Sequence, residues 1–424
     1  MKTIIKNGRV IDPANNLDTL LDIAFQDGKI TEVGPNLSHE GAEIIDATGL
    51  WVVPGLIDMH VHLRDPGAPH KETIASGSRA AAAGGFTTIC AMPNTAPVTD
   101  NEVVVEYILA RAAKTAAVHV LPIGSITKNL DGLELSQMGE MAQAGICAVS
   151  DDGKTVEDPA LLRTAMQYAK MFNLPVLCHC EDPRLGQGLI NAGDHANLLG
   201  FKGILPQAEE IIVARDIILQ RGTGAHLHIC HVSATGSLFH IREAKRLGAP
   251  VTAEVCPHHF TLCDEDITDY DPNFKMSPPL RGKTDMAALK AALADGTIDV
   301  IATDHAPHHD DDKQCEFQQA ANGIIGLETA VPLCVSELVE PGILTPSQMI
   351  AKLTANPARI LGLGKGTLSP GCCADITLIN PTDSYQIDKN AFASISRNTP
   401  FHGRRVRGRV IKTIVEGATQ YAYR

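Results

Sequence analysis

Residues 51–64 read Trp-Val-Val-Pro-Gly-Leu-Ile-Asp-Met-His-Val-His-Leu-Arg. The apolar part of this run predicts a strand that enters a hydrophobic core. Side chains two positions apart on a strand point to the same face, so His60 and His62 project two imidazoles side by side from the strand end. A chelated metal ion needs this geometry, although a His-x-His pair alone is a weak signal.

Four further donors follow later apolar runs in the same way, namely Asp152, His179, His231 and Asp304. Imidazole nitrogens and carboxylate oxygens suit Zn²⁺, with Mn²⁺ or Co²⁺ as alternatives. Together with the first two histidines, these residues predict a site for two metal ions, and Asp152 could bridge them. An open position on such an ion lowers the pKa of bound water to near 7 and makes that water a nucleophile.

The middle of the chain repeats a strand–helix unit. Strands are expected at 56–61, 86–91, 118–124, 146–150, 175–179, 226–231, 251–256 and 300–303. Helices are expected at 71–83, 102–114, 135–144, 159–172, 208–221, 236–247, 285–294 and 344–361. This alternation predicts an α/β fold, a parallel (β/α)8 TIM barrel, whose active site lies at the carboxyl ends of the strands. A doubly wound open sheet would not gather donors from so many strands around one point.

The two ends of the chain differ from its middle. Residues 1–53 and 365–424 contain short alternating runs separated by turn signals such as Asp27-Gly28 and Glu416-Gly417. Neither end has enough strands to bury a sheet face alone. We therefore expect a small β-sandwich-like unit built jointly by residues 1–53 and 365–424, beside a barrel of residues 54–364.

Charge and composition exclude several classes of protein. The 424-residue chain carries a net charge of −13 and has no basic cluster, which argues against a nucleic-acid surface. No apolar run is long enough for a membrane span, and no signal peptide is recognisable at the first residues. Its 11 cysteines lie mostly in apolar runs. These features predict free thiols and a cytoplasmic enzyme.

One of the donors, Asp304, and a residue beside them, Arg64, could also act directly on a substrate. Asp304, in the run 300–308, is a carboxylate that could accept a proton from metal-bound water and return it to a leaving group. Arg64 lies just beyond the histidine pair, and its guanidinium suits a substrate carboxylate. The sequence therefore predicts a hydrolytic site for an anionic substrate.

Several motifs resemble, in order, the dihydroorotase version of the amidohydrolase signature. They are His60-Val61-His62-Leu63-Arg64-Asp65-Pro66-Gly67, Met92-Pro93-Asn94-Thr95, Ser150-Asp151-Asp152-Gly153, His179-Cys180-Glu181-Asp182, Cys230-His231-Val232-Ser233, Lys275-Met276-Ser277-Pro278-Pro279-Leu280-Arg281 and Ala302-Thr303-Asp304-His305-Ala306-Pro307-His308. The resemblance covers essentially the whole chain and is to the longer, type I (class I) bacterial form. That family interconverts L-dihydroorotate and N-carbamoyl-L-aspartate in de novo pyrimidine (UMP) biosynthesis.

The resemblance implies roles for individual residues. It implies two zinc ions per subunit, held by His60, His62, Asp152, His179, His231 and Asp304. A metal-bound hydroxide would attack the ring amide carbonyl, and Asp304 would shuttle the proton. Substrate contacts would fall to His62, Arg64, Asn94, Ser277, His308, Asn322 and Gly323. A homodimer and a complex with aspartate transcarbamoylase are the expected assemblies.

The chain departs from the family pattern at two positions. The family commonly has Asn where Ser277 stands, and many relatives carry Phe where Asn322 stands. A hydantoinase or allantoinase is the alternative enzyme, but those relatives generally bridge their metals with a carboxylated lysine. Here Asp152 fits that position better than the nearby Lys154. A non-catalytic paralogue that scaffolds aspartate transcarbamoylase is a further alternative, which would be expected to lose metal ligands.

Overall fold

The computed structural model describes residues 2–423, and eight parallel strands form its central barrel. These strands are β6 (Leu56–Val61), β7 (Phe86–Ala91), β8 (His119–Pro122), β9 (Val149–Ser150), β10 (Val176–Cys178), β13 (Leu227–Ile229), β14 (Val251–Val255) and β15 (Val300–Ile301). Parallel ladders join most neighbours, and single bridges complete the ring at Gly124–Val149 and at Val61–His305. The fold class predicted from the sequence is therefore confirmed.

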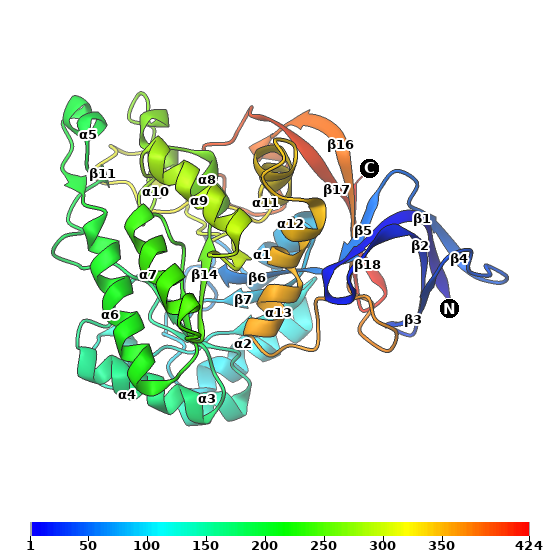
Figure 1. Ribbon diagram of the computed structural model, residues 1–424, viewed down its shortest axis with the longest axis horizontal. Coiled ribbons are helices and arrows are strands. Elements are labelled where there is room, and N and C mark those ends of the chain that lie inside the picture. The colour runs from blue at the N-terminus through cyan, green and yellow to red at the C-terminus, as the bar shows by residue number, and fades with distance from the viewer. Residues whose placement is uncertain (1, 424) are drawn as a thin grey trace.

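Helices surround the barrel, as Figure 1 shows. They are α1 (Ile74–Ala83), α2 (Glu102–Thr115), α3 (Met138–Ala144), α4 (Pro159–Met171), α6 (Gln207–Thr223), α7 (Thr235–Arg246), α9 (Lys283–Asp295), α11 (Ala330–Cys334), α12 (Pro346–Leu353) and α13 (Ala355–Ile360). Local signals set their starts: Asp158 accepts a hydrogen bond from the amide of Ala160 at 2.8 Å and caps α4, whose first residue is proline. None of the described helices has the length and apolar character needed to cross a bilayer.

One predicted helix is wrong in extent. The sequence favoured a single helix over 344–361, but the structure divides it into α12 and α13 at Thr354. Thr354 has φ −138° and ψ −83°, outside the helical region, and its hydroxyl donates to the carbonyl of Ile350 at 2.6 Å. Pro357 lacks an amide hydrogen and lies in the first turn of α13, where none is needed, so a new helix begins here.

Short elements occupy the loops above the barrel. They are β11 (Ile190–Asn191), β12 (Gly203–Ile204), α5 (Asp194–Leu199), α8 (Pro257–Thr261) and α10 (Asp310–Lys313). Each has six residues or fewer, which is too short for a periodic pattern to develop. This is why the sequence did not predict them.

Both ends of the chain contribute to one eight-stranded sheet beside the barrel. Its strands are β1 (Thr3–Asp12), β2 (Leu17–Gln26), β3 (Lys29–Gly34), β4 (Glu43–Asp46), β5 (Trp51–Pro54), β16 (Ile376–Gln386), β17 (Arg405–Val415) and β18 (Ala418–Ala422). The antiparallel pairing of β5 with β16 joins the N-terminal and C-terminal segments. Figure 1 shows both chain ends on this side of the molecule, and the domain limits 53/54 and 364/365 stay a prediction.

Each of the two parts has an apolar cluster of its own, and a larger cluster contains residues of both, such as Val53 and Leu56. Met59, Cys90, Leu177 and Val300 belong to a cluster contributed by the barrel strands. A different cluster, which includes Ile23, lies on the terminal sheet. β6, β7 and β14 are buried along their whole length, so the polar residues at their carboxyl ends stand on a rigid base.

Candidate metal centre and substrate cavity

The six predicted donors all lie at or just beyond the carboxyl end of a barrel strand. His60 is on β6, and the others follow β6, β9, β10, β13 and β15 within three residues. The backbone of His231 and Asp304 has positive φ values of 32° and 46°. A non-glycine residue rarely adopts this conformation, and such residues cluster at functional sites.

Asp152 lies between two groups of histidines. Its Oδ1 is 3.3 Å from Nε2 of His60 and 3.4 Å from Nε2 of His231, and its Oδ2 is 3.4 Å from Nε2 of His62. Nδ1 of His179 is 2.9 Å from Nε2 of His231. A carboxylate in this position has the placement that a bridging ligand requires.

Asp304 completes the first group of donors. Its Oδ1 lies 3.0 Å from Nε2 of His62 and 3.5 Å from Nε2 of His60. Although burial opposes ionisation, the neighbouring His60 and His62 imidazoles hold the pKa of this carboxyl well below its usual range. Asp304 is therefore an ionised proton acceptor at neutral pH.

The donor set fits divalent metal ions. Nε2 of His60 and Oδ1 of Asp152 are buried without a hydrogen-bond partner, and a coordinated ion would satisfy both atoms. Burial, followed by the neighbouring His231, lowers the pKa of His179 to about 4. This imidazole is thus neutral and able to donate a lone pair.

Two polar side chains orient the first histidines. Nδ1 of His60 lies 2.7 Å from Oε1 of Glu254, and Nδ1 of His62 lies 2.9 Å from Oδ1 of Asn94. Both contacts leave Nε2 free to face the centre. Despite the opposing effect of burial, the positive charge of His60 and a hydrogen bond from His228 lower the pKa of Glu254 to about 2. The sequence analysis did not identify Glu254, because its partner is 194 positions away.

A cavity of about 390 Å³ opens above the donors. Every predicted site residue except His60 lines it, and His60 is fully buried. These residues are His62, Arg64, Asn94, Asp152, His179, His231, Ser277, Asp304, His308, Asn322 and Gly323. The arrangement places a cation, amides and neutral imidazoles around a pocket of small-molecule size.

Loops on the cavity wall are tied together by hydrogen bonds. His308 Nε2 lies 2.9 Å from the carbonyl of Asn322, and burial, followed by the charge of Arg64, lowers the pKa of His308 to about 3. The side-chain amide of Asn398 donates to the carbonyls of Ala306 and Gly323 at 2.9 and 3.1 Å. Asn398 was not foreseen, because it comes from the C-terminal segment.

Ser277 has a partner that the sequence analysis did not give a role. Its hydroxyl lies 3.5 Å from Oε2 of Glu181, which also lines the cavity. Burial raises the pKa of Glu181, although the nearby Arg281 opposes this. Glu181 lies two residues after His179, within a motif that the sequence analysis had already singled out. Its position in that motif is the signal from which a role at the site could have been predicted.

Comparisons with known families agree with this geometry. A family model described as dihydro-orotase-like matches residues 49–237, and an amidohydrolase family model matches residues 220–421. A dihydroorotase of Pelotomaculum thermopropionicum is 53% identical over 418 residues, which cover 98% of each chain. A dihydroorotase of Pelobacter propionicus is 50% identical, and the alignment covers 99% of this chain and 100% of that one.

Solved structures with a similar fold include cyclic-amide hydrolases. An L-hydantoinase (dihydropyrimidinase) from Arthrobacter aurescens superposes with a TM-score of 0.89 at 26% identity, covering 98% of this chain and 95% of that one. A dihydropyrimidinase from Brevibacillus agri gives a TM-score of 0.86 at 25% identity, covering 99% and 95%. The fold and the overall arrangement of this chain are thus shared with these hydrolases.

Proposed function

Because the chain belongs to the dihydroorotase family of amidohydrolases, we propose that it interconverts L-dihydroorotate and N-carbamoyl-L-aspartate in pyrimidine biosynthesis. The chain is a hydrolase that acts on a cyclic amide. The observation that carries the proposal is the gathering of six donors around Asp152 beneath a cavity that also contains Arg64.

We assign the chain to the type I bacterial form and its metals to two zinc ions. His60, His62, Asp152, His179, His231 and Asp304 would hold them. The neutral imidazole of His179, the ionised carboxylate of Asp304 and two orphaned buried atoms support this donor set. Bound divalent ions supply Lewis acidity, which polarises a carbonyl and makes water more acidic.

The cavity residues orient the substrate. Arg64 provides the cation for the exocyclic carboxylate, and Asn94 and His308 provide neutral hydrogen-bonding groups beside it. Asn322 and Gly323 also line this cavity, and Ser277 stands where the family commonly has Asn. A Cβ on Gly323 would lie 2.8 Å from the carbonyl oxygen of Ala306, so the backbone here approaches the neighbouring segment at Ala306 as only glycine allows.

Asp304 moves the proton in both directions. During ring opening it accepts a proton from the attacking water and delivers it to the ring nitrogen as the amide bond breaks. During ring closure the same carboxyl group takes the proton from that nitrogen and returns it to the departing water. Its position 3.0 Å from Nε2 of His62, on the cavity wall, supports this role.

The hydantoinase and allantoinase alternative is less well supported. Nζ of Lys154 donates to the carbonyl of Leu130 at 2.8 Å, and Lys154 does not line the cavity above the donors. A carboxylated lysine bridge from this residue would require it to leave that contact. A purely scaffolding role is also disfavoured, because the donor set is complete.

The assembly and location follow from the same assignment. A homodimer that associates with aspartate transcarbamoylase in the cytoplasm is the arrangement that we propose. The donors and the other residues that line the cavity all belong to a single chain. Association would then change activity by ordering loops rather than by adding a ligand.

The test is metal analysis of the purified protein together with turnover assays. We expect two zinc ions per chain at the centre and activity on dihydroorotate and carbamoyl aspartate, measured with and without aspartate transcarbamoylase. Hydantoin and dihydrouracil lack the carboxylate and should be poor substrates. Equal activity on these neutral rings would contradict the assignment of dihydroorotate as the substrate.

A further inference from the structure

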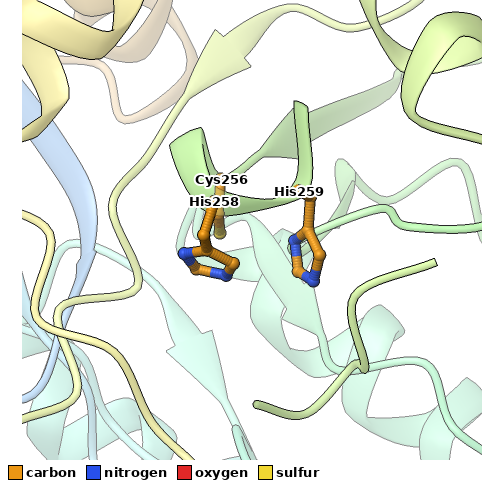
Figure 2. Close-up of side chains that lie close together, drawn as sticks. All are labelled: Cys256, His258 and His259. Carbon is orange, nitrogen blue, oxygen red and sulfur yellow. The ribbon is translucent and has the colours of Figure 1, made fainter. Parts of the chain in front are cut away.

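A second group of metal-type donors lies immediately after β14, outside the set of six. Cys256 precedes the short helix α8, and His258 and His259 are on that helix. One donor atom from each residue lies within 4.8 Å of the other two. Figure 2 shows the two imidazoles projecting from the same side of the helix, with Cys256 beside His258.

These three side chains are almost completely shielded from solvent. Their exposed fractions are 0%, 1% and 2%. Nε2 of His258 and Nδ1 of His259 are buried without a hydrogen-bond partner. A buried polar atom without a partner costs roughly 1–3 kcal/mol, so two in one cluster require an explanation such as a bound ion.

The tautomer of His259 is fixed in the form that a ligand needs. Its Nε2 lies 2.9 Å from the carbonyl of Pro278, which is an acceptor only, so Nε2 carries the hydrogen. Nδ1 of the same ring therefore presents a lone pair to the cluster. A histidine that binds a metal usually donates its other ring N–H to such a carbonyl.

The pKa values of His258 and His259 keep both imidazoles neutral and able to bind a metal ion. Burial lowers the pKa of His258 to about 4 and, together with the neighbouring His258, holds the pKa of His259 well below its usual range. Both rings are therefore neutral at physiological pH. Burial also raises the pKa of the Cys256 thiol, so an incoming ion must displace the thiol proton.

We propose that Cys256, His258 and His259 form an additional metal site that takes one soft, thiophilic cation per chain. One thiolate and two neutral imidazoles carry a charge of −1. A monovalent ion such as Cu⁺ gives a neutral buried complex with three ligands, whereas Zn²⁺ leaves one positive charge and calls for a fourth ligand. The six-donor centre contains only nitrogen and oxygen, so sulfur distinguishes the two sites.

The three donor atoms are almost as close to one another as they would be around a bound metal ion. Ligand bonds of about 2.0–2.3 Å place two donors on one ion no more than about 4.6 Å apart. The 4.8 Å limit of the cluster is thus within reach of small side-chain rotations. Coordination releases one proton from the thiol and forms one sulfur–metal and two nitrogen–metal bonds, with no change of oxidation state.

The site would act on the wall of the substrate cavity. His259 is hydrogen-bonded to Pro278, the residue after Ser277, and Met276 and Ser277 line the cavity. An ion on α8 would therefore fix the 276–278 segment relative to β14. Its role is structural support of the wall and not participation in the reaction.

The test uses cadmium NMR spectroscopy of the full chain expressed with cadmium as the probe. Cadmium bound to a thiolate resonates well apart from cadmium bound to nitrogen and oxygen alone. We expect one thiolate-type resonance in the wild type and its loss in C256S. The matched control is C334S, because Cys334 is also fully buried but belongs to none of the donor groups among the described residues. That variant should retain the resonance.

Metal analysis of protein expressed without cadmium identifies the native ion. The wild type should contain one equivalent of copper or zinc more than C256S, and His258→Gln should lose the same equivalent if C256S folds poorly. The proposal is overturned by an equal metal content in the wild type and both variants. It is also overturned by a thiolate-type resonance that persists in C256S or disappears in C230S instead, since Cys230 clusters with His60 and Glu254.

Discussion

Glu254 and His60 form a buried hydrogen bond across the barrel, with Oε1 of the carboxylate 2.7 Å from Nδ1 of the imidazole. Neither side chain is exposed to solvent. The contact joins β14 to β6 and fixes which nitrogen of His60 faces Asp152 and Asp304. The metal centre thus depends on a residue that is not itself among the six proposed ligands.

Replacing Glu254 with Gln should weaken metal binding without removing a proposed ligand. The amide keeps the size of the side chain but loses the charge that orients the His60 ring. We expect the metal affinity to fall about 10- to 100-fold, as judged by competition with a chelator. Glu140→Gln, at an exposed position on α3, is the control and should bind metal like the wild type. An unchanged affinity in the Glu254 variant would exclude this role.

Replacing Arg64 with Met should impair recognition of both substrates. The variant removes the cation from the cavity while keeping much of the aliphatic length. Loss of a buried charge-assisted pair costs about 2–4 kcal/mol, so kcat/KM should fall roughly 30- to 900-fold in each direction. The control, Arg163→Met on the exposed face of α4, should leave kcat/KM unchanged. A variant that loses activity with only one of the two substrates would point to a different anchor for the carboxylate.

Replacing Asp304 with Asn should abolish ring opening and ring closure together. The amide preserves the shape but cannot accept and return a proton. We expect both rates to fall by roughly a hundredfold or more, while part of the metal is retained. Metal content and both rates are measured on the same preparation, with exposed Asp310→Asn as the control. If only one direction were lost, His308 would become the candidate for the other proton transfer.

The pH dependence of stability should contain a contribution from Lys313. Burial and the neighbouring Lys275 lower the pKa of Lys313 to about 7, whereas an unfolded lysine titrates near 10.4. Between these values the unfolded chain binds the extra proton, so this group makes the fold more stable as the pH rises. Below about pH 7 both states are charged and the stabilisation is lost.

Lys313→Met should remove this dependence. The difference in unfolding free energy between the wild type and the variant should grow with pH above 7, by up to about 1.4 kcal/mol per unit. Thermal unfolding of both proteins from pH 7 to 10 measures it, and Lys114→Met, at an exposed position, should leave the slope unchanged. Parallel curves for the wild type and Lys313→Met would show that Lys313 stays protonated in the fold.

The sequence predicted most of the barrel because each strand is a short apolar run followed by a polar residue. The limits of β6 and β7 agree with the prediction, but β9, β13 and β15 are shorter than expected. β9 begins three residues later than expected, whereas β13 and β15 each end two residues earlier, where the chain leaves the barrel to present His231 and Asp304. Backbone pairing ends there although the side chains remain buried.

Residues that orient or connect the site could not be predicted in the same way. In the sequence, Glu254 is a polar residue within a predicted strand. Its role follows only from its hydrogen bond to His60 across the barrel. Asn398 belongs to an irregular segment 90 positions beyond His308, whose amide donates to it at 3.1 Å. No local pattern records such pairings, because they arise when the barrel closes and the terminal segment folds over it.

The pairing of β5 with β16 also affects how the chain is made. Residue 53 leaves the ribosome more than 300 residues before its partner at 377 is synthesised. During that time the β5 edge presents unpaired backbone groups, and exposed edges invite association with other chains. Completion of the terminal sheet therefore has to wait until synthesis is nearly finished, and a prematurely terminated chain would retain an open, aggregation-prone edge.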